Sequence, residues 1–190
     1  MFKNWKKNAL EKMDKSRAGG IDRPIQELVS KINNSDNMFT TSSCSGRIIV
    51  FSQGDDDTPG KGHCRWHLTS HEKINPEEFK KCVFNLDEHF SIKFEPCILH
   101  ICCEDLETAR NFCEDARAVG YRNSGISMGK PKKNNKPDKI TLAVRHTLGL
   151  EVPCPDKSLL SEKYLDFLID ECNKKMEENF RHIEKLTSIF

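Results

Sequence analysis

The sequence of 190 residues contains no long apolar run. No stretch approaches the roughly 20 apolar residues that a membrane-spanning helix needs. The first seven residues also lack the apolar segment of a secretory signal peptide. We therefore expect an intracellular, cytoplasmic protein that has no membrane partner.

Common cofactor and catalytic motifs are absent as well. The chain has no Walker loop, no G-x-G-x-x-G turn between a strand and a helix, and no nucleophile elbow. A nucleotide-like cofactor would therefore have to bind without the usual glycine-rich turn. By motif, the chain does not have a Rossmann fold.

An excess of one charge is missing too, because 30 basic and 29 acidic residues leave a net charge of only +1. This balance argues against a strongly basic nucleic-acid-binding protein, but charges can be segregated over a surface. Lysines and arginines do gather in residues 3–17 and 130–139, and acidic residues gather near 55–57 and 104–107. Such runs are usually solvated faces, and phosphate binding by residues 130–139 is the alternative.

Nine cysteines are present, an odd number in a chain without a secretory signal. This pattern indicates reduced thiols rather than disulfides. Most of them lie in apolar runs, where cysteine packs as a small hydrophobic residue. A hydrophobic content of 36% is enough for a core, and we expect residues 1–190 to form a single domain.

Apolar residues at helical spacing, together with capping residues, predict five helices. The predicted helices cover about residues 2–17, a segment that starts near Asp22 with Pro24 in its first turn, 75–85, 105–120 and 162–186. Asn75 and Asp105 are expected to cap their helices, and Gly120 to end one.

Alternating or continuous apolar runs predict the strands. They cover residues 38–41, 47–52, 63–69, 90–103, 121–128 and 140–146. The order of elements indicates an α/β or α+β domain, with a central mixed sheet covered by helices and a long C-terminal helix.

Residues 39–47 place five hydroxyls, a thiol, a glycine and a guanidinium between two apolar runs. We expect a loop here. Hydroxyls and glycine amides can bond a carboxylate or a phosphate, and Arg47 can add a two-pronged ion contact. The alternative is an ordinary Ser- and Gly-rich turn.

Two other places carry polar groups beside core strands. Glu95 and His100 lie inside an apolar strand, where each needs a partner or a cavity, and Pro96 implies a bulge or a strand edge between them. Arg122, Ser124 and Gly125 follow the helix stop and could meet an anion, with Arg145 on the neighbouring strand. In both places the alternative is a purely structural role.

The histidines at 63, 67 and 71, with Cys64, could suggest a metal cluster. Zinc sites usually repeat paired ligands, and no second pair matches these. We therefore expect polar surface histidines and no metal.

Seven segments in collinear order resemble the tRNA wybutosine-synthesizing protein 3 family. They are residues 40–47, Trp66 with His71, residues 94–100, 121–126, 143–145, 150–153 and 173–179. The resemblance spans nearly the whole chain.

The resemblance implies an enzyme that uses S-adenosylmethionine to methylate tRNA. Its substrate would be phenylalanine tRNA carrying a wybutosine precursor next to the anticodon, and the methyl acceptor would be a ring nitrogen of the intermediate that already bears an aminocarboxypropyl group. Such a transfer needs aligned approach of the two atoms and removal of the ring-nitrogen proton, with no covalent enzyme intermediate.

The resemblance also suggests roles for individual residues. His100 would accept the proton, with Glu95 and His71 as other catalytic candidates. The expected cofactor contacts are Ser43, Ser45, Gly46, Arg47, Ser124 and Gly125. The expected tRNA contacts that the resemblance suggests are Arg122 and Arg145. The charge pattern of residues 130–139, and not the resemblance, adds Lys132, Lys133 and Lys136 as expected tRNA contacts. Cys97 and the Lys-rich insertion at 130–139 depart from the pattern that the family leads us to expect.

The competing hypothesis is a tRNA- or nucleotide-binding module without catalysis. Binding of S-adenosylmethionine followed by methyl transfer to precursor tRNA separates the two hypotheses. The sequence does not decide the oligomeric state.

Overall fold

The structure is a computed structural model that describes residues 1–11, 20–53, 64–129 and 139–190. The end of the predicted first helix, the polar turn at 54–62, His63 and most of the Lys-rich insertion lie outside these ranges. Within them, every helix is too short or too polar to cross a bilayer.

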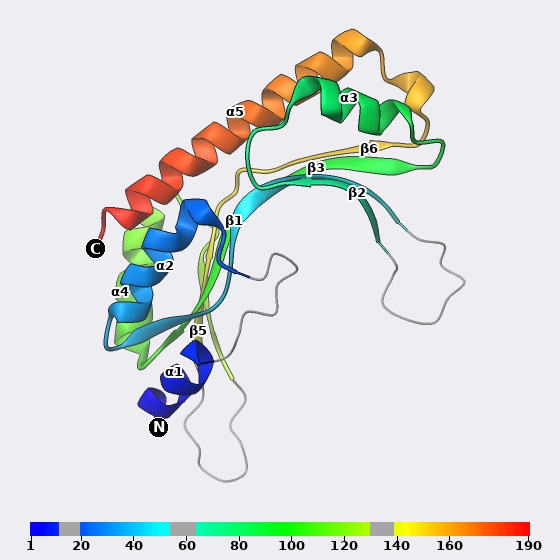
Figure 1. Ribbon diagram of the computed structural model, residues 1–190. Coiled ribbons are helices and arrows are strands. Elements are labelled where there is room, and N and C mark those ends of the chain that lie inside the picture. The colour runs from blue at the N-terminus through cyan, green and yellow to red at the C-terminus, as the bar shows by residue number, and fades with distance from the viewer. Residues whose placement is uncertain (12–19, 54–63, 130–138) are drawn as a thin grey trace. The chain divides into compact units, whose positions relative to one another are not determined.

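The described helices follow the predicted order (Figure 1). They are α1 (Phe2–Leu10), α2 (Gln26–Asn34), α3 (Pro76–Phe84), α4 (Leu106–Ala118) and α5 (Glu162–Thr187). Short 3-10 turns at Arg23–Ile25 and Lys157–Leu159 precede α2 and α5.

Six strands form one sheet in the described part of the chain. They are β1 (Met38–Ser52), β2 (Arg65–Ser70), β3 (Phe90–Cys103), β4 (Gly125–Met128), β5 (Ile140–Arg145) and β6 (Leu150–Cys154). The order is β2-β1-β3-β5-β4, and β6 also pairs with β3.

The α/β class and the long C-terminal helix are confirmed. The predicted mixed sheet is instead antiparallel in each pairing whose register is described, namely β1 with β2, β3 with β5, β3 with β6, and β4 with β5. Antiparallel neighbours need no long crossover between them.

The chain divides into two compact units. Unit 1 comprises Met1–Ser45, Cys97–Thr147 and Phe180–Phe190, and unit 2 comprises Gly46–Pro96 and Leu148–Asn179. We describe each unit by itself. The expectation of a single domain over residues 1–190 stays a prediction.

Unit 1 has a core on each face of its strands. On one face, α2, α4 and the end of α5 bury apolar side chains against alternate residues of β3 and β5, such as Leu99, Ile101, Leu142 and Val144. On the other face, Phe2 of α1 packs with Phe39 and Cys102. The distance between the Phe2 and Phe39 ring centroids is 5.4 Å.

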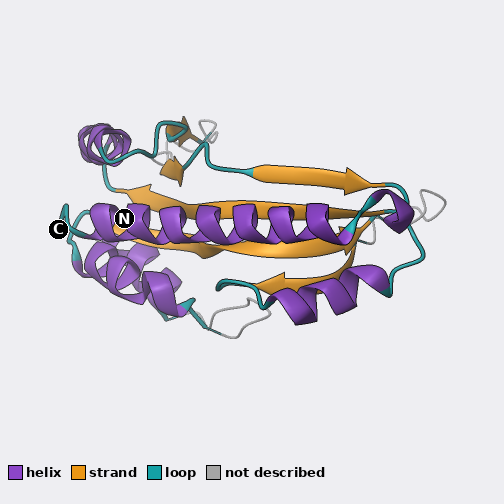
Figure 2. Cartoon of the chain, turned by 90° about the horizontal axis from the view of Figure 1, so that it is seen from above, coloured by secondary structure: helices purple, strands orange, loops and turns teal. Residues whose placement is uncertain are grey.

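Unit 2 places α3 and the first part of α5 on one face of its strands (Figure 1). Figure 2 shows from above that α5 runs along the strands rather than across them. Asn173 of α5 bonds the backbone of Ile74 twice, accepting from its amide at 2.8 Å and donating to its carbonyl at 3.2 Å. This pair of bonds ties α5 to the segment before α3.

The predicted hydroxyl loop is wrong, because residues 38–52 form one continuous strand, β1. The break predicted between two strands is only a local change at Gly46, whose φ of 97° is accessible mainly to glycine. Threonine and serine hydroxyls can point out from a strand without interrupting its ladder. A polar composition therefore did not require a loop.

Two other assignments differ from the prediction. Residues 121–124 form a turn before β4 instead of belonging to the strand. The strand β6 was not predicted. β6 pairs with β3 alone in the described sheet, and this edge position tolerates a proline.

The burial pattern of β3 changes phase at Glu95 and Pro96. Before them the even-numbered residues Phe90, Ile92 and Phe94 are buried, and after them the odd-numbered residues Cys97, Leu99 and Ile101 are buried. Because strand side chains alternate with a period of two, this change means one extra residue in the strand. The predicted irregularity at Pro96 is present.

The predicted helix ends at Asn75, Asp105 and Gly120 are confirmed. The Asn75 side chain accepts from the amides of Glu77 and Glu78, and Asp105 accepts from the amide of Thr108. At the end of α4 the Gly120 amide donates to the Arg117 carbonyl and the Tyr121 amide to the Ala116 carbonyl. These two bonds form a Schellman motif with Gly120 at φ 115°.

Gly120→Ala is expected to destabilise the protein by about 1–3 kcal/mol, because a methyl group there is strained at positive φ. It would also lie 2.6 Å from the ring of His182. Urea unfolding followed by circular dichroism measures the change. The matched control is Gly125→Ala, which has open space around the new methyl group and an unremarkable φ; equal losses in both variants would contradict the prediction.

Candidate functional site

The predicted proton acceptor His100 lies at the centre of a polar cluster in unit 1. Its ring Nδ1 is 2.9 Å from the Ser42 hydroxyl, and its Nε2 is 3.4 Å from Nη2 of Arg145. The Thr41 hydroxyl donates to the His100 carbonyl at 3.1 Å. The side chain is half-buried, and the partner that its place in an apolar strand requires is the Ser42 hydroxyl.

These contacts select one tautomer of neutral His100. A guanidinium has only donors, so the ring nitrogen that faces Arg145 must accept. Nε2 therefore carries the lone pair, and the proton lies on Nδ1 and is donated to Ser42. The cluster holds an imidazole whose basic nitrogen points toward a cation.

The pKa of His100 is lowered from its ordinary value, first by burial and second by the positive charge of Arg145. Both causes penalise the imidazolium form. His100 is therefore neutral at pH 7, which is the state that a proton acceptor requires.

The Ser124 hydroxyl holds the end of β5 against the preceding turn. It donates to the Tyr121 carbonyl at 2.6 Å and accepts from the Arg145 amide at 3.1 Å. Nη2 of Arg117 donates to the Ser124 carbonyl at 2.7 Å. Ser124 is buried, and its contacts fix the backbone from which the exposed Arg145 side chain projects.

Beneath this turn, the Tyr121 ring is buried. Burial and the neighbouring Cys97 thiol raise the pKa of the Tyr121 phenol. Burial likewise raises the pKa of the Cys97 thiol, with a further contribution from Cys44. Both groups are protonated at neutral pH. Cys97, which differs from the residue type expected in the family, therefore has a packing role. All nine cysteines are free and six are buried, in line with reduced packing residues.

Asp22 lies near the expected start of the second helix. Its side chain makes no cap bond to the following turn. Instead its Oδ2 accepts from the Ser45 amide at 2.8 Å and so fixes β1 within unit 1. The Ser45 side chain is fully buried, whereas Ser43 is half-buried.

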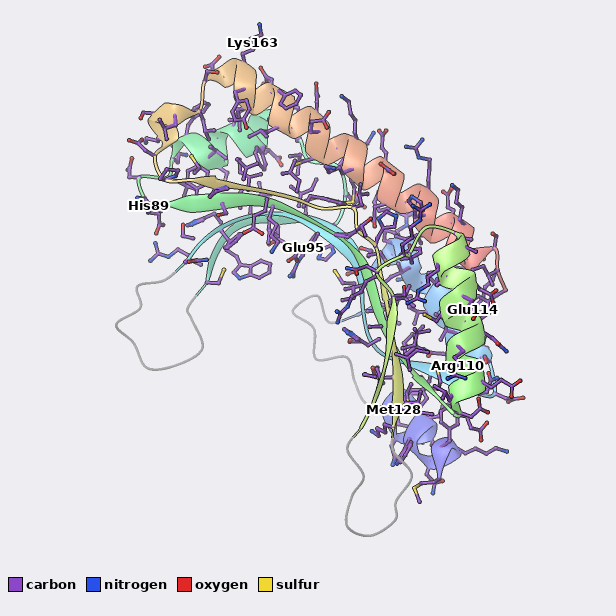
Figure 3. All side chains as sticks on the ribbon, turned by 180° about the vertical axis from the view of Figure 1, so that it is seen from behind. His89, Glu95, Arg110, Glu114, Met128 and Lys163 are labelled. Atoms are coloured by element: carbon purple, nitrogen blue, oxygen red, sulfur yellow. The ribbon has the colours of Figure 1, made fainter. Side chains whose placement is uncertain are left out.

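In unit 2, Arg47 and Glu95 form an ion pair, with 2.8 Å between Nε and Oε2. The Arg47 guanidinium also lies 4.4 Å from the centre of the Trp66 ring, which is a cation–π distance. Figure 3 shows Glu95 on the side of the unit 2 strands away from α3 and α5. Arg47, predicted to meet an anionic ligand, thus has a carboxylate of the protein as a partner.

The ion pair extends through Lys93. Its Nζ lies 3.4 Å from Oε1 of Glu95 and 3.1 Å from Oε2 of Glu151. Burial lowers the pKa of Lys93, but the two carboxylates outweigh it and raise the pKa above the ordinary value. Cations and carboxylates alternate along this part of unit 2, so charge is compensated locally.

The histidines of the suspected metal cluster are dispersed in the described structure. His67 is 2.8 Å from the Ser52 hydroxyl and 3.6 Å from a Glu88 oxygen. His71 follows β2 and donates from Nδ1 to the Gly46 carbonyl at 3.0 Å. His63 lies outside the described residues.

The remaining predicted contacts fall into two groups. Arg122 and Gly125 are exposed beside the Ser124 turn, whereas Lys132, Lys133 and Lys136 lie outside the described residues. Sequence reasoning missed Ser42, Asp22 and Trp66 as positioning groups. Ser42 lay within the noted hydroxyl segment, but nothing in the sequence distinguished it from its neighbours.

With this geometry in place, a family model described as methyltransferase TYW3 matches residues 4–190. The chain belongs to this family. It is therefore a methyltransferase, and the resemblance first inferred from seven short segments is confirmed.

Relatives and solved structures agree with this assignment. The chain is 40% identical to a tRNA wybutosine-synthesizing protein 3 homolog of Xenopus laevis, over 98% of this chain and 73% of the relative. It is 39% identical to the homolog of Homo sapiens, over 97% of this chain and 70% of the relative. The PH1069 protein from Pyrococcus horikoshii has a similar structure, with 26% identity, a TM-score of 0.83, and coverage of 99% of this chain and 95% of that one.

The tautomer of this methyltransferase's His100 can be tested directly. Above its pKa, nitrogen NMR is expected to show the proton on Nδ1, and Ser42→Ala should increase the form protonated on Nε2, because the acceptor for Nδ1–H is removed. The backbone spectrum should otherwise persist. A wild-type His100 protonated mainly on Nε2 would contradict the inferred hydrogen bonds.

Proposed function

We propose that this methyltransferase transfers a methyl group from S-adenosylmethionine to a ring nitrogen of a wybutosine precursor in phenylalanine tRNA. A role in tRNA methylation during wybutosine biosynthesis rests on the family and on the names of the relatives. The donor, the tRNA identity and the position of the methylated atom are our inference from the sequence.

The observation that supports a reaction centre is the His100 cluster. It combines a basic nitrogen, a hydroxyl that fixes the tautomer, and an exposed guanidinium on one face of unit 1. A proton acceptor needs to be neutral and within hydrogen-bond reach of the group it deprotonates. His100 meets the first condition, and its Nε2 faces the exposed Arg145 side chain.

The chemistry proposed is in-line displacement. When bound, S-adenosylmethionine would supply an electrophilic methyl group on its sulfonium, and its thioether would leave as the ring nitrogen takes the methyl group. His100 would accept the ring-nitrogen proton on Nε2. The resulting imidazolium retains its Nδ1–H bond to Ser42. Arg145 opposes this charge, so it must shift toward a phosphate or carboxylate of the substrate for His100 to accept the proton.

The residues expected to hold S-adenosylmethionine fit unevenly. The donor has a carboxylate, an ammonium group and ribose hydroxyls to satisfy. Ser43 is reachable, and Gly125 offers backbone with no atom within 4 Å of the place where a side chain would begin. Ser45, Gly46 and Ser124 are buried in internal hydrogen bonds and would act by positioning the strands. Arg47 would contact an anion only in addition to Glu95.

For the tRNA we propose contacts from Arg122 and Arg145, which are exposed, and from Lys132, Lys133 and Lys136 of the insertion. Glu95 and His71 remain alternative proton acceptors. In unit 2, each is engaged with the protein, Glu95 with Arg47 and His71 with the Gly46 carbonyl. These engagements make His100 our first choice.

The decisive experiment measures methyl transfer. Purified protein, radiolabelled S-adenosylmethionine and tRNA from cells that lack the enzyme should give labelled phenylalanine tRNA, with the label on the wybutosine precursor. Calorimetry should show donor binding. Donor or tRNA binding without transfer would favour the non-catalytic module instead.

The pH dependence follows from His100. Its neutral form is the active one and its pKa is lowered, so the rate should rise with pH through a single group below the ordinary histidine pKa of about 6.5 and then level off. In His100→Gln the rate should be low and should no longer rise with pH, while binding of S-adenosylmethionine persists. An active variant with an unchanged pH profile would assign the proton to Glu95, His71 or water.

Arg47→Ala is expected to lower methyl transfer about tenfold to a hundredfold, the effect of losing a charged contact of roughly 1.5–3 kcal/mol. Stability should fall by only about 1 kcal/mol or less, since both partners of its ion pair are about one-third exposed.

Arg65→Ala is the matched control, because Arg65 also pairs with a glutamate in unit 2, at 2.9 Å. It should leave turnover unchanged. If the loss of activity in Arg47→Ala is matched by a fall in its melting temperature, the role of Arg47 is structural and the prediction is contradicted.

A further inference from the structure

In the described part of unit 1, one face carries no acidic side chain at its strand positions. We call it the α1 face, because α1 packs on it through Phe2, and it lies opposite the α2, α4 and α5 core. Alternation from the core residues and from the pairing of β3, β4 and β5 assigns its strand positions. They are Phe39, Thr41, Ile98, His100, Cys102, Gly125, Ser127, Thr141, Ala143 and Arg145, with Lys139 just before β5. The Ser42 hydroxyl departs from this alternation and also lies on the α1 face, because it is 2.9 Å from Nδ1 of His100.

These described strand positions carry Arg145 and no carboxylate, in a chain with 29 acidic residues and a net charge of +1. In unit 2, by contrast, Glu95 and Glu151 pair with Arg47 and Lys93. Among the described residues, the strand positions of the α1 face therefore favour a local positive potential, which the overall charge hides.

Helix α1 adds to this potential. It carries Lys3, Lys6 and Lys7 and no acidic residue between its ends. Lys6 is held by the Ser35 carbonyl, and Lys3 and Lys7 are exposed. The nearest carboxylate in sequence, Glu11, lies 3.8 Å from Lys7 in a pair exposed to solvent, which compensates little charge.

Lys139 joins α1 to the strands. Its Nζ lies 5.2 Å from the centre of the Trp5 ring, a cation–π contact between α1 and the start of β5. Arg145 is six residues further along, or about 20 Å at strand rise. Cations at both ends thus flank the hydroxyls of Thr41, Ser42 and Thr141 and the imidazole of His100.

We propose that the α1 face binds a single RNA strand, with phosphates on Lys3, Lys7 and Lys139, and that this strand leads the target base to His100 and Arg145. A positive track interleaved with hydroxyls suits phosphates and ribose hydroxyls. The proposal rests on tRNA being the substrate and names the surface that receives it.

The test compares two variants of the full chain with equal charge change. The first is Lys3→Gln/Lys7→Gln/Lys139→Gln. The control is Arg110→Gln/Arg181→Gln/Lys185→Gln, which removes three exposed cations of unit 1 from α4 and α5. Figure 3 shows Arg110 on α4. Binding of a phenylalanine tRNA transcript is measured by fluorescence anisotropy at several salt concentrations.

The first variant should weaken binding at least tenfold and reduce the slope of log affinity against log salt by about 2, since each single-strand phosphate contact contributes about 0.7. The control should stay within twofold of wild type. If the triple variant melts earlier, the Lys3→Gln/Lys7→Gln double variant carries the test, with an expected slope change of about 1.4.

An unchanged slope in the first variant, or equal losses in both variants, overturns the proposal. So does competition by polyglutamate as strong as that by tRNA, which would indicate an acidic protein partner. Methyl transfer at saturating tRNA separates this inference from the proposed function. If the triple variant shows the reduced salt slope but the wild-type protein transfers no methyl group, the proposed function alone is refuted. If the wild-type protein transfers methyl groups but the variant keeps the wild-type slope, the proposed surface alone is refuted.

Discussion

The pairing of β3 with β5 is the constraint on which the candidate site depends. Its register places Ile98 opposite Arg145 and His100 opposite Ala143, so His100 and Arg145 are diagonal neighbours on the same face. Diagonal positions of an antiparallel pair are within reach of a long side chain. A slip of one residue would point the His100 side chain into the core formed with α2, α4 and α5, and Arg145 would lose its contact with His100.

The extra residue at Glu95 and Pro96 allows β3 to keep this register and still bury its apolar side chains both before and after that residue. The apolar side chains of β3 are even-numbered before it and odd-numbered after it. Without this change of phase, a strand that buries Phe94 would also bury His100. Proline is suited to the position because a bulge interrupts the ladder and needs fewer amide donors.

Electrostatics differ between the two units. In unit 2, carboxylates accompany Arg47 and Lys93, and the outcome is a compensated network next to Trp66. In unit 1, the strand positions of the α1 face are free of carboxylates, and Arg145 faces an imidazole. A nearly neutral chain thereby presents a locally basic face, which composition could not reveal.

The sequence by itself determined much of the local structure. Helix ends at Asn75, Asp105 and Gly120 follow from capping chemistry within a few residues, and the apolar runs specified β3, β5 and α5. Seven ordered segments were enough for the family, and with it the class of reaction. These features depend on residues close together in the chain.

The tertiary structure decided how the polar residues are used. The sequence could not tell that the hydroxyl-rich segment is a strand, because whether serine and threonine fit a strand depends on the neighbour they pair with. Nor could it assign Arg47 to Glu95, Ser42 to His100 or Asp22 to Ser45, since these partners lie 48, 58 and 23 residues apart. Hydrogen bonds and ion pairs act over about 3–4 Å, and only the pairing of strands brings such distant residues to that range.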